Sequence, residues 1–278
     1  MAVSNEKSWQ YLVSRYNQLV HPPARPCRQQ LAFWQQLITR LPRQTNRALI
    51  LGATPELRDL ALRNNFFTFA IDISPAMLRG MTKLMHRANP RRERRIVADW
   101  RTVVLPQNHF DLVMADASLN NVLSAAGVRA VLRQVAGALA PAGMALMRTI
   151  VAPETARIKP ITWWLRSVER GSGINPSDFS VIIRAASREA GLKSPAGRVD
   201  SVRVCRALLR HAAVTSRRQR PVIDFFYRAL GQEHKYLLIY QHAAYERLLK
   251  QFFIIRRLPG CREHVSCRTV FVTHLLRK

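Results

Sequence analysis

The sequence predicts an α/β protein whose core is a doubly wound, mostly parallel sheet. Short apolar runs that suit buried strands alternate with helical segments over residues 47–151, and glycine or aspartate follows most of the strand ends. Such alternation forms a parallel sheet with helices on both faces, and these sheets bind ligands at the carboxyl ends of their strands. Gly52, Asp72, Asp99 and Asp116 all fall at these ends.

The elements follow one another in a regular order. The expected strands are 48–51, 68–71, 95–98, 110–115 and 144–151, and the expected helices are 55–64, 75–87 and 124–140, with a turn at 141–143. After Val151 the alternation stops, and it resumes with a helix at 241–251 and strands at 252–255 and 269–276. These last strands are too close in sequence for a helical crossover, so they should pair antiparallel and complete a seven-stranded sheet.

The same pattern predicts three regions. Residues 1–46 form a helical N-terminal cap, residues 47–151 and 241–278 form the ligand-binding domain, and residues 152–240 form a helical insertion after the fifth strand. An insertion at this point hangs over the carboxyl ends of the strands. With the N-terminal cap it should form a lid that selects the substrate, the alternative being a plain helical buttress.

Length and composition indicate a folded protein. The chain has 278 residues, of which 48% are hydrophobic, enough for a full core. It shows no membrane span, signal peptide or transit peptide, so a cytoplasmic location is expected. The four cysteines contain no CxxC pair, and the spacing of Cys261, His264 and Cys267 lacks a fourth metal ligand, so we expect neither a disulfide framework nor a metal site.

The net charge of +27 stands out, and only 7 of the 44 basic residues are lysine. Such a field attracts nucleic acid, anionic lipid or an acidic small substrate. The arginines are spread along the chain, however, so solvated surface decoration explains them as well. Local basic clusters occur at 91–95, 217–220 and 256–257.

Gly52 and Asp72 form the most informative motif. A glycine turn that opens a helix, followed 20 residues later by an acid after the second strand, places a backbone cradle beside a carboxylate suited to ribose hydroxyls. Thr54 stands where a dinucleotide-binding loop has its second glycine, which disfavours close approach to a pyrophosphate. Thr54 can cap the helix and Pro55 suits its first position, so the helix dipole should face a smaller anion, such as an amino-acid carboxylate. This favours S-adenosylmethionine over a dinucleotide.

Five helix-linked strands, a helix and a closing hairpin resemble the class I, Rossmann-like S-adenosylmethionine-dependent methyltransferases. The resemblance covers about residues 47–278 and is best over 47–151, with residues 152–240 as an insertion. Residues 110–121 are similar to the family's fourth-strand signature, and residues 141–143 are similar to its Pro-Gly-Gly turn.

The resemblance implies S-adenosylmethionine as cofactor and a binding set at the strand ends, which comprises Gly52, Thr54, Glu56, Asp72, Ile73, Asp99, Trp100 and Asp116. In this family the first loop holds the methionine part, the acid after the second strand holds the ribose, and the acid after the third contacts the adenine amine. Asp72 and Asp99 match those two acids, with Trp100 as an adenine neighbour.

Catalytic candidates follow the fourth strand. Asp116 and Asn120 should lie where the transferred methyl emerges, so they can orient an acceptor or take its proton. Arg148, inside the fifth strand, needs a partner, which is either a nearby acid or an anionic substrate.

We therefore predict methyl transfer to an O, N or S atom of a small-molecule acceptor, an anionic one being suited to the charge. The positive charge leaves RNA methylation as an alternative. A non-catalytic binding protein is another alternative, because two residues depart from the family pattern. Ile50 replaces the acid that positions the methionine ammonium, and Thr54 replaces the second glycine of the first loop. An NAD-dependent oxidoreductase is disfavoured by the missing glycines.

Overall fold

The computed structural model describes residues 13, 16–20, 25–152, 196–210, 236–257 and 271–277. The basic cluster at 217–220 and the Cys261-to-Cys267 segment lie outside the described residues. The chain divides into two compact units, described separately below. Unit 1 comprises residues 1–27, 150–245 and 260–272, and unit 2 comprises residues 28–149, 246–259 and 273–278.

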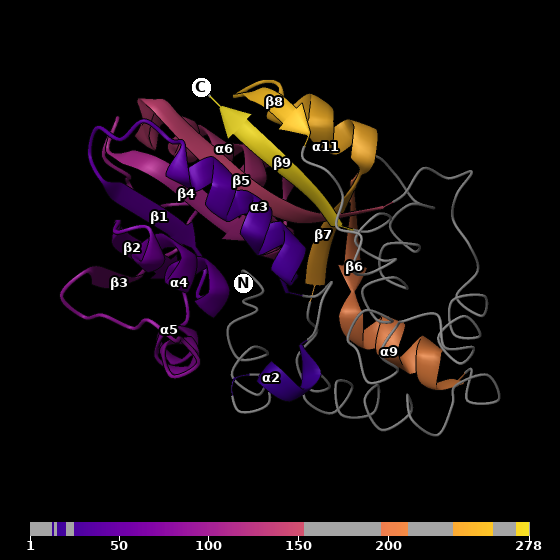
Figure 1. The fold of residues 1–278 in the computed structure, drawn as a ribbon. Coiled ribbons are helices and arrows are strands. Elements are labelled where there is room, and N and C mark those ends of the chain that lie inside the picture. Colours follow the sequence, from indigo (N-terminus) through magenta and orange to yellow (C-terminus); the bar gives the residue numbers. More distant parts are fainter. Residues whose placement is uncertain are drawn as a thin grey trace. The chain divides into compact units, whose positions relative to one another are not determined.

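Unit 2 contains the predicted parallel sheet. Its strands run in the order β3-β2-β1-β4-β5, and every neighbouring pair is parallel (Figure 1). The bounds are Arg47–Leu51 for β1, Phe67–Asp72 for β2, Glu93–Val97 for β3, Phe110–Asp116 for β4 and Leu139–Ala152 for β5. The central strands β1 and β4 are buried almost throughout, as their continuous apolar sequences predict for a sheet covered on both faces.

Helices connect these strands, namely α3 (Arg28–Thr39) before β1, α4 (Pro55–Arg63), α5 (Pro75–Thr82) and α6 (Ala125–Ala138). Ser74 and Ser124 cap α5 and α6, each accepting a backbone N–H three residues on. Thr54 occupies the cap position of α4 and Pro55 follows it, but Thr54 makes no side-chain capping bond, so the predicted cap is wrong in that respect.

Helix α5 is shorter than the predicted 75–87. The backbone N–H groups of His86 and Arg87 donate to the two carboxylate oxygens of Asp59 at 2.8 Å each, and not to preceding helical carbonyls. The helix itself ends at Thr82, since the N–H groups of Lys83, Leu84 and Met85 donate to carbonyls three residues back, and Asp59 of α4 then holds the chain that follows. The local sequence pattern could not show this contact with Asp59.

The predicted turn at Pro141-Ala142-Gly143 is part of β5, at a point where the register between β4 and β5 shifts. Phe110 pairs with Leu139, but Leu112 pairs with Met144, so β5 has extra residues at this point. A Cβ on Gly143 would lie 3.0–3.1 Å from the backbone oxygens of Ala140, Phe110 and Asp111. Glycine is required here because backbone surrounds the site on all sides.

The closing hairpin forms as predicted. Strands β8 (Ile254–Arg257) and β9 (Phe271–Arg277) pair antiparallel with Ile254 opposite Arg277, and β9 also pairs with β5. Helix α11 (His242–Leu249) precedes them. Together with β1 to β5 they make up the predicted seven-stranded, mostly parallel sheet with an antiparallel last strand.

Unit 1 adds two strands that the sequence analysis missed. Strands β6 (Ala196–Asp200) and β7 (Tyr236–Gln241) pair antiparallel, and β7 runs parallel to Val151–Ala152 at the end of β5. Helix α9 (Ser201–Arg210) follows β6. The apolar, aromatic run of β7 is a strand signal, whereas β6 is short and lacks clear alternation.

Candidate active site at the carboxyl ends of the strands

Gly52 ends β1 with φ +108°, a backbone conformation that favours glycine. Its N–H donates to the carbonyl of Ile71 at 2.8 Å, which ties the first loop to β2. A Cβ at this position would lie 3.4 Å from Ser118 Oγ, 3.9 Å from Asp72 Oδ2 and 3.9 Å from Trp100 Cζ2. Side chains from the ends of three other strands therefore meet at the backbone of Gly52, where a side chain would fill the space.

Asp72 ends β2 and Ile73 follows it. The Oδ1 atom of Asp72 accepts the Ser74 N–H at 2.8 Å, and Ser74 in turn caps α5 by accepting the Met77 N–H at 3.2 Å. Ser74 is thus the helix cap, and Oδ2 of Asp72 lies on the Gly52 side. Ile73 is 41% exposed, so its apolar side chain is available to cover a flat ligand.

Trp100 follows β3 and is fixed by its ring nitrogen, which donates to the Ile71 carbonyl at 2.7 Å. Asp99 makes a different contact, an ion pair with the guanidinium of Arg101. The hydrogen bond from Arg101 lowers the pKa of Asp99, although partial burial opposes it. Asp99 is therefore an ionised acceptor on a half-exposed turn.

The first turn of α4 supplies polar groups beside Gly52. Thr54 and Glu56 are both half-buried, and Glu56 is the acidic residue of this turn. Because α4 directs its N-terminal N–H groups toward the first loop, its dipole favours an anion there.

The end of β4 is held by an ion pair between Asp116 and Arg148 of β5, whose side chains are 4% and 0% exposed. This confirms the first of the two alternatives for Arg148, that it pairs with a nearby acid. Ala117 then adopts a left-handed conformation with φ +53°, and its N–H donates to the Arg148 carbonyl at 2.9 Å. A backbone hydrogen bond and the ion pair together set the path of the chain after β4.

A short 3₁₀ helix, η1 (Ser118–Asn121), follows this turn. The Ser118 hydroxyl donates to the Leu51 carbonyl, which joins η1 to the end of β1. Asn120 is fully buried in η1. Sequence analysis did not select Ser118, since a serine after a strand is common and its partner lies 67 residues away.

The structure therefore brings Gly52, Asp72 and Trp100 together and places Asp99 on the adjoining turn, with Asp116 and Asn120 at the end of β4. No group of three or more potential metal-ligating side chains occurs among the residues that the structure describes. Within the same residues, no helix is long and apolar enough to cross a membrane.

Comparison with known proteins identifies a methyltransferase domain within the chain. Residues 52–143 match the family model described as a methyltransferase domain. No curated protein matches the sequence.

Solved structures share the fold at low identity. A proposed Zn-dependent alcohol dehydrogenase from Rhodobacter sphaeroides is 13% identical with a TM-score of 0.60, and 100% of both chains is covered. An S-adenosylmethionine-dependent methyltransferase from Mesorhizobium loti is 15% identical with a TM-score of 0.50, covering 89% of this chain and 98% of that one. A proposed methyltransferase of the same kind from Listeria monocytogenes is 12% identical with a TM-score of 0.51, covering 88% and 97%.

The fold and the family match define a methyltransferase domain. Residues 52–143 thus match a methyltransferase domain, and the sheet of unit 2 has the fold shared by the S-adenosylmethionine-dependent methyltransferases that the chain is similar to.

Proposed function

We propose that the chain transfers the methyl group of S-adenosylmethionine to an O, N or S atom of a small-molecule acceptor. The convergence of Asp72, Trp100 and Ser118 on the backbone at Gly52 is the observation that carries this function. The space that a Cβ would fill there suits close approach of a cofactor to the first loop, and the surrounding groups suit an adenosine moiety.

The ribose and adenine would be held on one side of Gly52. Asp72 offers carboxylate oxygens to two vicinal hydroxyls, since Oδ2 lies toward the loop while Oδ1 accepts Ser74 N–H. Ile73 and Trp100 present flat or apolar surface to the base. Asp99 can accept from the exocyclic amine, and it shares its charge with Arg101.

The methionine part would lie at the N-terminus of α4. The Thr54 hydroxyl is not used for capping, so we assign it, with the helix dipole, to the carboxylate of the cofactor. Glu56 supplies negative charge near the place of the family acid that Ile50 replaces, and it is assigned to the methionine ammonium.

The bound cofactor supplies a methyl group already activated on a sulfonium, so the protein mainly has to align the acceptor and exclude water. Such positioning contributes about 7–11 kcal/mol to lowering a barrier. Asp116 and Asn120 are assigned to this positioning. The ion pair with Arg148 favours an orienting role for Asp116 over that of a general base. The predicted lid, residues 152–240 with the N-terminal cap, is assigned to acceptor selection.

Thermal unfolding with added ligand tests the cofactor assignment. S-adenosylhomocysteine should raise the melting temperature and NAD should not, because only a ligand of the folded state stabilises it. Mass spectrometry of the purified protein for bound S-adenosylmethionine or its demethylated product gives a second readout. Stabilisation by neither ligand would support the non-catalytic alternative, and stabilisation by NAD alone would support an oxidoreductase.

A further inference from the structure

A strongly basic segment connects α5 to β3. Between Arg79 and Arg95 the chain has seven basic residues and one acid. The basic residues are Arg79, Lys83, Arg87, Arg91, Arg92, Arg94 and Arg95, and the acid is Glu93.

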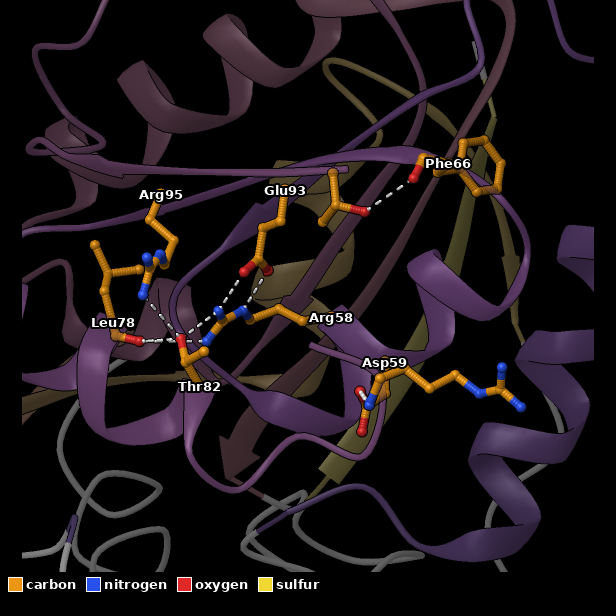
Figure 2. A network of polar contacts seen from close by, with 9 residues as sticks. Arg58, Asp59, Phe66, Leu78, Thr82, Glu93 and Arg95 are labelled. Carbon is orange, nitrogen blue, oxygen red and sulfur yellow. Dashed lines mark hydrogen bonds and ion pairs between the residues drawn. The ribbon is translucent and has the colours of Figure 1, made fainter. Parts of the chain in front are cut away.

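Glu93 does not offset this charge at the surface. It is 7% exposed, and its two oxygens accept from Nε and Nη2 of Arg58 at 2.7 and 2.6 Å. Figure 2 shows this pair beneath the strand, with Arg58 also donating to Thr82. Since Arg58 is itself fully buried, the carboxylate is neutralised inside unit 2 and not by its exposed neighbours.

The exposed cations are held on an ordered backbone. Arg95 donates to Thr82 Oγ1 at 3.5 Å, which links β3 to the end of α5 (Figure 2). Asp59 fixes the loop between them through the N–H groups of His86 and Arg87. We define the α5–β3 basic surface as the exposed side chains of Arg79, Lys83, Arg87, Arg91 and Arg95.

Ordinary surface roles account for only part of this arrangement. Charged residues protect an exposed edge strand, and β3 is an edge of the parallel sheet in unit 2, which explains Arg94 and Arg95. Arg79 and Lys83 are four residues apart at the end of α5, where like charges are mutually unfavourable. A solvated face normally mixes both signs. An anion that spans several cations would relieve this repulsion.

We propose that the α5–β3 basic surface binds the phosphate backbone of a nucleic acid. Four of its five cations are arginines, whose forked guanidinium matches phosphate oxygens. A membrane surface is less suited, since interfacial binding needs apolar anchors. The exposed large hydrophobic residues among those described are Ile73, Val97, Val104 and Ile254, none of which lies between Arg79 and Arg95.

The surface is separate from the candidate active site. Helix α5 begins after the carboxyl end of β2, beside Asp72, and its other end leads to the start of β3. Lys83, Arg87 and Arg91 therefore lie toward the amino ends of the strands, away from Gly52. Binding here would hold the protein on a nucleic acid without occupying the cofactor site, and it does not depend on the identity of the methyl acceptor.

The test uses a fluorescent oligouridylate and measures fluorescence anisotropy over a range of salt concentrations. The variant Arg79→Glu/Arg87→Glu/Arg91→Glu removes three exposed cations for which the structure gives no side-chain partner among the residues it describes. Loss of three phosphate contacts should reduce the slope of log affinity against log salt by about 2. At about 0.1 M salt this corresponds to a loss of affinity on the order of 100-fold.

The matched control is Arg40→Glu/Arg129→Glu/Arg133→Glu, three exposed arginines elsewhere in unit 2 whose reversal changes the net charge equally. It should keep the wild-type slope. Equal weakening by both triple variants would overturn the proposal in favour of a general charge effect, and wild-type binding by the first variant would overturn it outright. If the first variant lost binding to phosphatidylserine vesicles but kept its binding to oligouridylate, the proposal would be overturned in favour of a lipid surface. S-adenosylhomocysteine should still raise the melting temperature of the first variant. Loss of oligouridylate binding can therefore be distinguished from loss of the proposed cofactor binding.

Discussion

The two ends of β4 each carry a buried aspartate, and the two are held in different ways. At the amino end, Asp111 is 1% exposed and accepts the N–H groups of Gln44, Thr45 and Asn46 at 2.6–3.2 Å. At the carboxyl end, the Asp116 side chain is 4% exposed and pairs with a guanidinium, that of Arg148.

This difference separates a structural end of the sheet from a functional one. Asp111 anchors the loop before β1 through backbone donors, so its role depends on the path of the chain and on no other side chain. Asp116 pairs with a side chain of β5, and that pair adjoins the turn that carries Ser118 and Asn120. Substitutions at the amino end should therefore affect stability alone, whereas those at the carboxyl end should affect stability, cofactor binding or both.

Removing Arg148 should have the largest effect. The Arg148→Met substitution leaves a buried carboxylate without its guanidinium, and the free energy of unfolding should fall by about 3–5 kcal/mol. Urea denaturation measures this loss. The double variant Asp116→Leu/Arg148→Met should recover at least half of it, since an apolar pair carries no unpaired charge. A double variant that is as unstable as the single one would show that packing, and not charge, makes the Arg148 site sensitive.

Removing Asp111 should cost somewhat less. The Asp111→Ala substitution leaves three backbone donors in a partly exposed loop, where water can replace some of the lost bonds, so we expect a decrease of about 2–4 kcal/mol in the free energy of unfolding. Affinity for S-adenosylhomocysteine, measured by calorimetry on the folded fraction, should be unchanged. A large loss of affinity in Asp111→Ala would contradict the separation of the two ends.

Asp72 belongs to the functional edge, so its removal should show the reverse pattern. Asp72→Ala should weaken S-adenosylhomocysteine binding by roughly 10- to 150-fold, because charge-assisted hydrogen bonds of about 1.5–3 kcal/mol are lost. The melting temperature without ligand should change little. Asp72→Asn, which keeps an acceptor for Ser74 N–H, serves as the matched control. Its affinity for S-adenosylhomocysteine should lie between those of the wild type and Asp72→Ala. Wild-type affinity in a folded Asp72→Ala protein would place the cofactor elsewhere.

The smallest effect concerns Cys205 of α9 in unit 1. Burial raises the pKa of its thiol to about 12 from 9.0, with Asp200 contributing. The folded state therefore keeps the thiol protonated, and its contribution to stability is lost only as the pH rises above the ordinary thiol value. At pH 8 the thiolate population should be about 1,000-fold below that of a free cysteine. Iodoacetamide labelling followed by peptide mapping should find Cys205 unmodified in the folded protein and modified in urea, and rapid native labelling would show that it is accessible.

The alternation of strands and helices over residues 47–151, the closing hairpin and the polar residues at the strand ends could all be predicted from the sequence. These features depend on local periodicity and on glycine, proline and serine at particular positions, as at Gly52 and Ser74, so nearby residues are sufficient to predict them.

The contacts between groups far apart in the sequence could not be predicted and are seen only in the folded protein. Arg148 with Asp116, Arg58 with Glu93, and Ser118 with the Leu51 carbonyl each join elements far apart in the chain. The path of the chain after α5 has the same origin, because Asp59 of α4 accepts the N–H groups of His86 and Arg87. Such pairings depend on how the helices and strands pack against one another, and local patterns in the sequence do not show this packing.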